Sequence, residues 1–304
     1  MTMAISVYKA PYAGWPNCFW VVNEKVECVV TSDVGPRVIR FALKGGPNEF
    51  AEMQEQLGLT GGDEWRIYGG HRLWHSPEKR ARTYFPDNAP VQVTVLPDGV
   101  EVTQPTETTT GIKKVIRLRM APEAPRVEVE HRLINEGLWR VEMAAWCLSV
   151  MAPGGVGIVP QDLTADEEGL LPNRVLSLWP YTDLSDPRYT WGKHLIRLRQ
   201  DPQRGPTKFG LSVPAGWCAY ANRGHMFIKQ FSYLEDRTYP DFGASVELYT
   251  NERFLELETL SPLYVVAPGE EIAHLETWHL FAGVELPTDE EEVMTAVARL
   301  LGRA

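Results

Sequence analysis

The sequence is poor in cysteine, and its four cysteines, Cys18, Cys28, Cys147 and Cys218, lie far apart. No two of them form a Cys-x-x-Cys pair, so a thiolate zinc site is not expected. Four cysteines in a chain of 304 residues also do not indicate a disulfide-stapled scaffold. Each lies among apolar residues, which is typical of a small buried side chain.

Basic runs and long apolar runs are missing as well. The chain has a formal net charge of −10 and a pI near 5.3, so we expect neither nucleic acid nor an anionic membrane as partner. No window approaches the roughly 18 apolar residues of a membrane-spanning helix. Residues 1–15 lack a charged start and a sustained apolar core, which disfavours a signal peptide. These features predict a cytoplasmic protein.

Helical patterns are scarce. Residues 47–57 are compatible with a short helix. The clearest pattern covers residues 288–301, where Thr288 and Glu291 form a capping box and Val293 and Val297 begin an apolar stripe. We expect this last helix to pack against a sheet.

Short stretches of β-branched and aromatic residues, separated by turn residues, fill most of the chain. About fifteen of them follow one another without the strand–helix alternation of a parallel sheet. The pattern predicts an all-β fold, a large antiparallel β-sandwich formed by residues 1–304 as one domain, with few short helices and a C-terminal helix. The Pro- and Asp-rich residues 160–189 form a long excursion between strands, and such loops are often functional.

Residues 246–263 carry the strongest functional signal. Side chains of a strand point alternately to its two faces, so Glu256 and Glu258 share one face while Leu257 and Thr259 share the other. Two neighbouring carboxylates indicate either a polar cavity that binds hydroxyls or cations, or a solvated outer face of a sheet.

Four segments occur in a characteristic order along the chain. They are residues 29–48 with Ser-Asp-Val-Gly-Pro-Arg, residues 67–77 with Tyr-Gly-Gly-His, residues 127–137 ending in Asn-Glu-Gly, and residues 257–270 with Glu-Thr-Leu-Ser-Pro and Pro-Gly-Glu. The segments and their order resemble those of the galactose-mutarotase-like superfamily, the β-supersandwich of aldose epimerases and related sugar-binding domains. The resemblance points to a branch other than the aldose epimerases themselves. It implies the supersandwich fold and a small-molecule sugar ligand.

The resemblance also implies catalytic roles. Glu258 is similar to the catalytic glutamate of the family and would take the proton of the anomeric hydroxyl, while Glu256 would raise its pKa by like-charge repulsion. The epimerases carry a catalytic histidine on the strand after Asn-x-Gly, but residues 145–151 contain none. A general acid would then come from His71 or His75, which follow the two glycines; each is equally compatible with a structural histidine.

Further residues are candidates for substrate binding. Arg72 offers planar donors to sugar hydroxyls or forms a structural ion pair, and Trp74 is either a stacking platform or part of the core. Lys229 is a lone cation in an apolar strand and needs a partner, for which Asp241 or Glu258 is suitable. We expect these groups to converge with His71 on one pocket. The full set of expected substrate ligands is Arg72, Trp74, Lys229, Tyr239, Asp241, Glu247 and Glu256.

Three functions follow from these patterns. The first is a mutarotase- or epimerase-like isomerase that acts on a free sugar or sugar derivative by acid/base catalysis. The second is a non-catalytic carbohydrate-binding module, which the missing epimerase histidine favours, and the third is a lyase or hydrolase on the same scaffold. We expect no metal or other cofactor; the alternative is a zinc ion held by His71, His75 and Glu258. The sequence does not indicate the oligomeric state.

Overall fold

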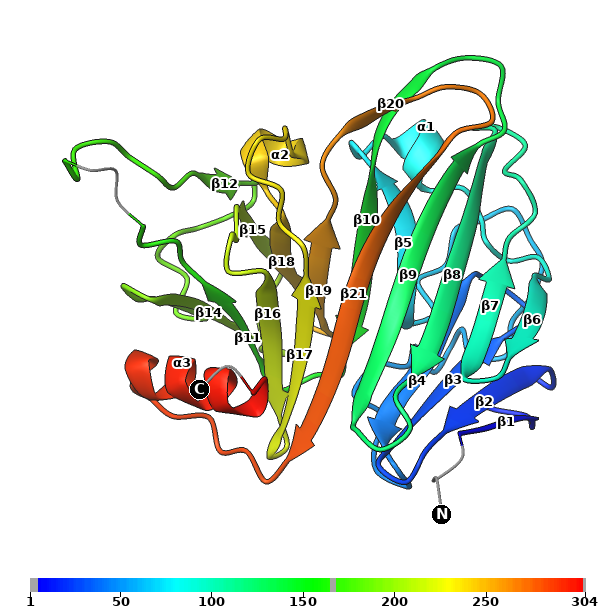
Figure 1. The fold of residues 1–304 in the computed structure, drawn as a ribbon, viewed down its shortest axis with the longest axis horizontal. Helices are drawn as coiled ribbons and strands as arrows, with labels where there is room; N and C mark the ends of the chain where they lie inside the picture. Colours follow the sequence, from blue (N-terminus) through cyan, green and yellow to red (C-terminus); the bar gives the residue numbers. More distant parts are fainter. Residues whose placement is uncertain (1–4, 165–167, 303–304) are drawn as a thin grey trace.

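Strands are the main regular structure of the computed structural model, which describes residues 5–164 and 168–302. Figure 1 shows two large sheets facing each other, and each pair of strands in the described residues is antiparallel. The three described helices are only 4, 4 and 11 residues long. The predicted antiparallel β-sandwich with few helices and a C-terminal helix is therefore confirmed.

The first sheet has the strand order β1-β2-β3-β4-β5-β10-β19-β18-β15-β12, and β20 also pairs with β10. Its strands are β1 (Ser6–Lys9), β2 (Cys18–Val22), β3 (Val26–Thr31), β4 (Arg37–Leu43), β5 (Gly70–Ser76), β10 (Val141–Met151), β12 (Leu176–Leu178), β15 (Thr207–Leu211), β18 (Val246–Thr250), β19 (Leu255–Leu260) and β20 (Tyr264–Val266).

The second sheet has the order β13-β14-β11-β16-β17-β21-β9-β8-β7-β6. Its strands are β6 (Gln92–Leu96), β7 (Gly99–Thr103), β8 (Ile112–Met120), β9 (Arg126–Asn135), β11 (Val156–Pro160), β13 (Tyr189–Trp191), β14 (Leu195–Arg199), β16 (Trp217–Asn222), β17 (His225–Phe231) and β21 (Glu271–Ala282).

The main core lies between the two sheets. Because strand residues alternate in direction, every second side chain of each central strand points into this layer. Phe41 of β4, for example, lies 5.6 Å between ring centroids from both Phe227 of β17 and Trp278 of β21. These contacts between distant strands fix the two sheets against each other.

The C-terminal helix α3 (Glu290–Leu300) covers the outer face of the second sheet (Figure 1). Val293 and Val297 are buried in a cluster that includes Ile158 and Ile228 of that sheet. The N-cap is Asp289, one residue later than the Thr288 that the sequence predicts, because the carboxylate of Asp289 accepts the backbone N–H of Glu292 at 3.0 Å. In the described part of the chain, no helix is long and apolar enough to cross a membrane.

The short helix predicted within residues 47–57 is not present. Instead, Phe50 and Glu52 form isolated β-bridges with Met151 and Gly69. The side chain of Asn48 accepts the backbone N–H of both Phe41 and Phe50 at 3.1 Å. A side chain that bonds nearby backbone groups in this way competes with helix formation.

Candidate functional site

The central strands of the first sheet place the candidate residues on two opposite faces. In β5, Arg72 and Trp74 point to the outer face, whereas His71 and His75 point into the sandwich. The expected convergence of His71 with Arg72 on one pocket is wrong, because consecutive residues of a strand point in opposite directions. In β19, Glu256 and Glu258 share the outer face, as the alternation of the sequence predicts.

A cavity of about 440 Å³ lies on this outer face. Its walls are rich in aromatic side chains, and two cations and two carboxylates reach it. We call it the aromatic pocket; it is lined by Trp65, Ile67, Arg72, Trp74, Glu78, Tyr84, Trp146, Leu148, Trp179, Tyr181, Pro206, Lys208, Tyr249, Phe254 and Glu256. Its volume is within the range of about 300–1,000 Å³ that is typical of small-ligand sites.

Arg72 forms one side of the aromatic pocket. Its Nη2 donates to Glu256 at 2.8 Å, and its guanidinium carbon lies 4.3 Å from the ring centroid of Trp74 and 5.4 Å from that of Trp65. The Nε and Nη1 groups of Arg72 and the Nε1 group of Trp65 are buried without a hydrogen-bond partner in the described residues. Buried donors are normally paired, so these groups are suited to bind a ligand.

Lys208 of β15 forms the opposite side and bridges two buried carboxylates. Its Nζ lies 2.7 Å from Glu247 and 3.0 Å from Glu258, which face each other directly across β18 and β19. Like charges at such positions repel, and the ammonium group between them offsets this repulsion. Burial raises the pKa of both carboxyl groups, and Lys208 beside them lowers it only in part.

Glu258 lies directly beneath the aromatic pocket. It is fully buried, and its Oε2 accepts the indole N–H of Trp146 at 2.7 Å. Its Oε1 has no hydrogen-bond partner within the described residues. The two groups that cover Glu258, Trp146 and Lys208, both line the pocket. Only the side chains of Trp146 and Lys208 thus separate Glu258 from a ligand in the pocket.

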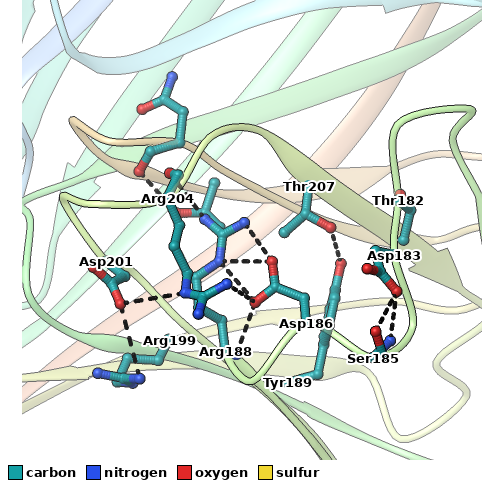
Figure 2. A network of polar contacts seen from close by, with 12 residues as sticks. Thr182, Asp183, Ser185, Asp186, Arg188, Tyr189, Arg199, Asp201, Arg204 and Thr207 are labelled. Carbon is teal, nitrogen blue, oxygen red and sulfur yellow. Dashed lines mark hydrogen bonds and ion pairs between the residues drawn. The ribbon is translucent and has the colours of Figure 1, made fainter.

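The long excursion between β11 and β14 supplies a wall of the aromatic pocket through Trp179 and Tyr181. The hydroxyl of Thr182 donates to the backbone carbonyl of Lys208 at 2.5 Å, next to the pocket. Figure 2 shows how the chain that follows is held in place: Tyr189 and Thr207 share a hydrogen bond of 2.6 Å, and Asp186 pairs with Arg188 at 2.8 Å. These bonds fix the wall without requiring regular structure.

His71 belongs to a buried polar network between the two sheets. Its Nε2 lies 2.7 Å from Nε2 of His131, and its Nδ1 lies 2.9 Å from the hydroxyl of Ser149. The carbonyl of His274 can only accept, so Nδ1 of His131 carries the proton and its Nε2 accepts from His71. Burial lowers the pKa of His71 and His131 and keeps both rings neutral.

Lys229 lies in the same network, and its partner is Glu276, not Asp241 or Glu258 as the sequence analysis proposed. Lys229 Nζ is 2.9 Å from Glu276 Oε1, and both side chains are fully buried. Glu276 also accepts hydrogen bonds from Thr259 and from the indole of Trp278. Burial by itself would raise the pKa of Glu276, but the ammonium group of Lys229 holds it below its usual range.

This network is the nearest approach to a metal site in the described residues. His71, His131 and Glu276 bring ligand atoms within 4.8 Å of one another, as do Cys147, His274 and Glu276. The Lys229 ammonium group beside Glu276 would repel a cation there. The alternative zinc set of His71, His75 and Glu258 is not formed, because Glu258 lies on the other face of the sheet.

His75 is buried on the inner side of β5, near the charges of Lys114 and Arg82. Burial, followed by these two cations, lowers its pKa to about 3. The unfolded chain would bind a proton at His75 below about pH 6.5, whereas the folded chain would not. This histidine therefore makes the protein less stable as the pH falls from about 6.5 toward 3.

Replacing His75 with leucine is expected to remove that contribution. Between pH 6 and 4, the free energy of unfolding should fall less steeply than in the wild type, by about 1.4 kcal/mol per pH unit. Urea unfolding at several pH values measures the two slopes. Parallel curves for the two proteins would show that His75 is not held neutral in the folded state.

Tyr239 and Asp241 do not line the aromatic pocket. The hydroxyl of Tyr239 accepts the backbone N–H of Leu234 at 2.9 Å, and burial raises its pKa to about 12. Asp241 is part of a tight turn in α2 (Pro240–Gly243), with φ of 49°, and lines a separate cavity of about 180 Å³ next to Trp179. Its charge acts on Glu247, whose pKa it helps to raise.

Sequence reasoning missed several residues of the pocket, above all Lys208. Lys208 lies in β15, next to the strand's first residue, Thr207. The argument that singled out Lys229, a lone cation beside apolar strand residues, applies equally to Lys208. Trp65, Trp146 and Trp179 gave no comparable signal, because a tryptophan in a β protein is as often in the core as in a site.

The two facing antiparallel sheets, with a cleft on the outer face of one of them, place the protein among the large β-sandwiches. Among solved structures, the chain is similar to a galactose mutarotase-like protein from Lactobacillus casei ATCC 334, with 9% identity, a TM-score of 0.57, and coverage of 87% of this chain and 100% of the other. It is also similar to a galactose mutarotase-like protein from Clostridium acetobutylicum, with 9% identity, a TM-score of 0.51, and coverage of 92% and 99%.

The Slr1438 protein from Synechocystis sp. PCC 6803 is a further similar structure, with 11% identity, a TM-score of 0.58, and coverage of 90% of this chain and 99% of the other. These likenesses show that the chain has the galactose-mutarotase-like fold, as the order of its motifs implied. No protein-family model matches the sequence, and no curated protein matches it.

Proposed function

We propose that the protein binds a carbohydrate in the aromatic pocket. The observation that carries the proposal is the combination of aromatic walls with buried, unpartnered donors of Arg72 and Trp65. The apolar faces of sugar rings pack on aromatic side chains, while their hydroxyls take up hydrogen bonds that fix orientation. The galactose-mutarotase-like fold supports the same conclusion.

The charges of the pocket favour a neutral sugar. Arg72 is already paired with Glu256, and Lys208 is shared by Glu247 and Glu258. Glu78 adds a further carboxylate to the lining. An acidic sugar would meet more negative than positive charge here, so we expect uronic acids and sugar phosphates to bind more weakly than the neutral sugar.

A second candidate function is sugar isomerisation by acid/base catalysis, with Glu258 as base. The raised pKa of this buried carboxyl group beside the pocket favours it. The proton donor is harder to find, since no histidine of residues 5–164 and 168–302 lines the aromatic pocket. The tyrosine hydroxyls that do line it, such as those of Tyr181 and Tyr249, have pKa values that burial raises. Binding is therefore the first proposal and turnover the second.

Replacing Arg72 with methionine is expected to weaken sugar binding at least about 10-fold, because hydrogen bonds to a charged group contribute about 1.5–3 kcal/mol. Calorimetric titration with a panel of neutral monosaccharides measures the affinity. The matched control is Arg117→Met, which removes an ion-paired arginine of β8 in the other sheet and should leave binding unchanged.

A second variant distinguishes a loss of binding from a loss of folding, because Arg72→Met also leaves Glu256 without its partner. Trp74→Leu keeps the Arg72–Glu256 pair but removes an aromatic wall, and it should weaken binding as well. If the wild type binds none of the sugars, or both variants bind as the wild type does, the aromatic pocket is not a carbohydrate site.

A further inference from the structure

A second, larger cavity lies beside the aromatic pocket and shares one residue, Tyr84, with it. Its volume is about 620 Å³, against about 440 Å³ for the aromatic pocket. Loops and helix α1 (Arg80–Thr83) form it, and we call it the loop pocket. The residues that matter below are Asp63, Tyr84, Asp87, Asn88, Gln104 and Thr108.

Tyr84 is held firmly where the two cavities meet. Its ring centroid lies 4.9 Å from that of Trp74 and 5.4 Å from that of Trp65, both of which line the aromatic pocket. Its hydroxyl donates to Glu78 at 2.5 Å. An aromatic ring that borders both cavities offers a surface to ligand groups on each side.

The loops around the loop pocket are fixed by buried hydrogen bonds. Arg37 pairs with Asp87 at 2.9 Å, and the amide of Asn88 donates to the carbonyls of Gly62 at 3.1 Å and Glu64 at 2.7 Å. The hydroxyl of Tyr68 donates to the side-chain oxygen of Asn88 at 2.9 Å. A cavity whose walls are fixed before binding loses little entropy when a ligand enters.

The chemistry of the loop pocket suits a polyhydroxylated, uncharged ligand. Gln104 is buried, and its Oε1 has no hydrogen-bond partner in the described part of the chain. Thr108 adds an exposed hydroxyl, and Tyr84 an aromatic ring. The lining includes Asp63 and Asp87 but, among the described residues, no lysine, arginine or histidine. Because Asp87 is paired with Arg37, Asp63 is the carboxylate of this lining that would repel a phosphorylated or acidic ligand.

We propose that the loop pocket is a second sugar subsite, so that the ligand is a neutral oligosaccharide whose adjoining units lie on either side of Tyr84. The inference rests on the proposed function, because it extends the same site from one sugar ring to several. It goes beyond that function by assigning the length of the ligand.

The test is calorimetric titration with glucose, galactose, mannose and xylose and with their neutral oligomers of two to four units, in α and β linkages. For the sugar that binds, we expect the trimer to bind at least about 10-fold more tightly than the monomer, the equivalent of about 1.4 kcal/mol. Thr108→Trp fills the loop pocket and should abolish this gain while leaving the affinity for the monomer unchanged. Gln104→Leu should reduce the gain.

The matched control is Thr94→Trp, which places the same bulk at an exposed threonine of β6 that does not line either pocket. Thermal melting confirms that each variant is folded. Equal affinity for monomer and oligomers overturns the second subsite and leaves the proposed function intact. A gain that survives in Thr108→Trp also overturns it. If the wild type binds neither monomers nor oligomers, the proposed function fails, and this inference with it.

Discussion

Replacing Lys229 with methionine is expected to lower the free energy of unfolding by about 3–5 kcal/mol, because it leaves the carboxylate of Glu276 buried without its cation. Both side chains are fully buried between the sheets, 2.9 Å apart. Thr259 and Trp278 still donate to Glu276 in the variant, but two neutral donors do not replace an ammonium group. Urea unfolding near neutral pH measures the loss.

Two further variants distinguish the loss of the ion pair from a general loss of core packing. Adding Glu276→Gln to Lys229→Met should recover part of the loss, because no buried charge then remains. Lys25→Met, at an exposed lysine, should change stability by less than about 0.5 kcal/mol. The difference between Lys229→Met and the wild type should also shrink as the pH falls, since the unpaired carboxylate can take up a proton. A loss that Glu276→Gln does not relieve would contradict the ion-pair explanation.

Replacing Glu258 with glutamine is expected to slow sugar anomeric exchange at least about 100-fold if the protein is an isomerase. The variant keeps the shape of the side chain and an oxygen that accepts the Trp146 indole N–H, but it removes the base. Sugar binding should weaken less than catalysis. Stability should change little or rise, because Lys208 then faces one carboxylate, Glu247, instead of two.

The comparison requires NMR exchange rates, calorimetry and thermal melting on the wild type and the variant. Glu107→Gln is the matched control, since Glu107 is also buried and paired with a lysine, Lys114, but does not line the aromatic pocket. A Glu258→Gln protein that melts much lower and loses binding and activity together would assign Glu258 a structural role. A wild type that binds sugar without accelerating exchange would leave only the binding function.

The fold could be predicted from the sequence because the alternation of each strand is a local signal and the order of the motifs can be read along the chain. The same alternation correctly placed Glu256 and Glu258 on one face of their strand. In residues 67–77 two adjacent glycines hide the alternation, although Gly70–Ser76 is the central strand β5. Arg72 and His71 were therefore assigned to the same pocket, although they lie on opposite faces.

Partners on different strands of one sheet were beyond what the sequence can predict. Lys229 needs a carboxylate, and several acids satisfy this requirement equally well from spacing alone. Only the pairing of β17 with β21 brings Glu276 within 2.9 Å, and that pairing depends on the folding of the whole chain. Lys208 meets Glu258 for the same reason, since β15 reaches β19 only through β18.

In β5, β10 and β19, even-numbered and odd-numbered residues lie on opposite faces of the sheet. Even-numbered positions such as Arg72, Trp146 and Glu256 face the aromatic pocket, whereas odd-numbered positions such as His71 and Ser149 face the buried network. Evolution or an engineer can therefore vary ligand preference and stability separately by substitution. A single-residue insertion or deletion in one of these strands would exchange the two sets and damage both at once.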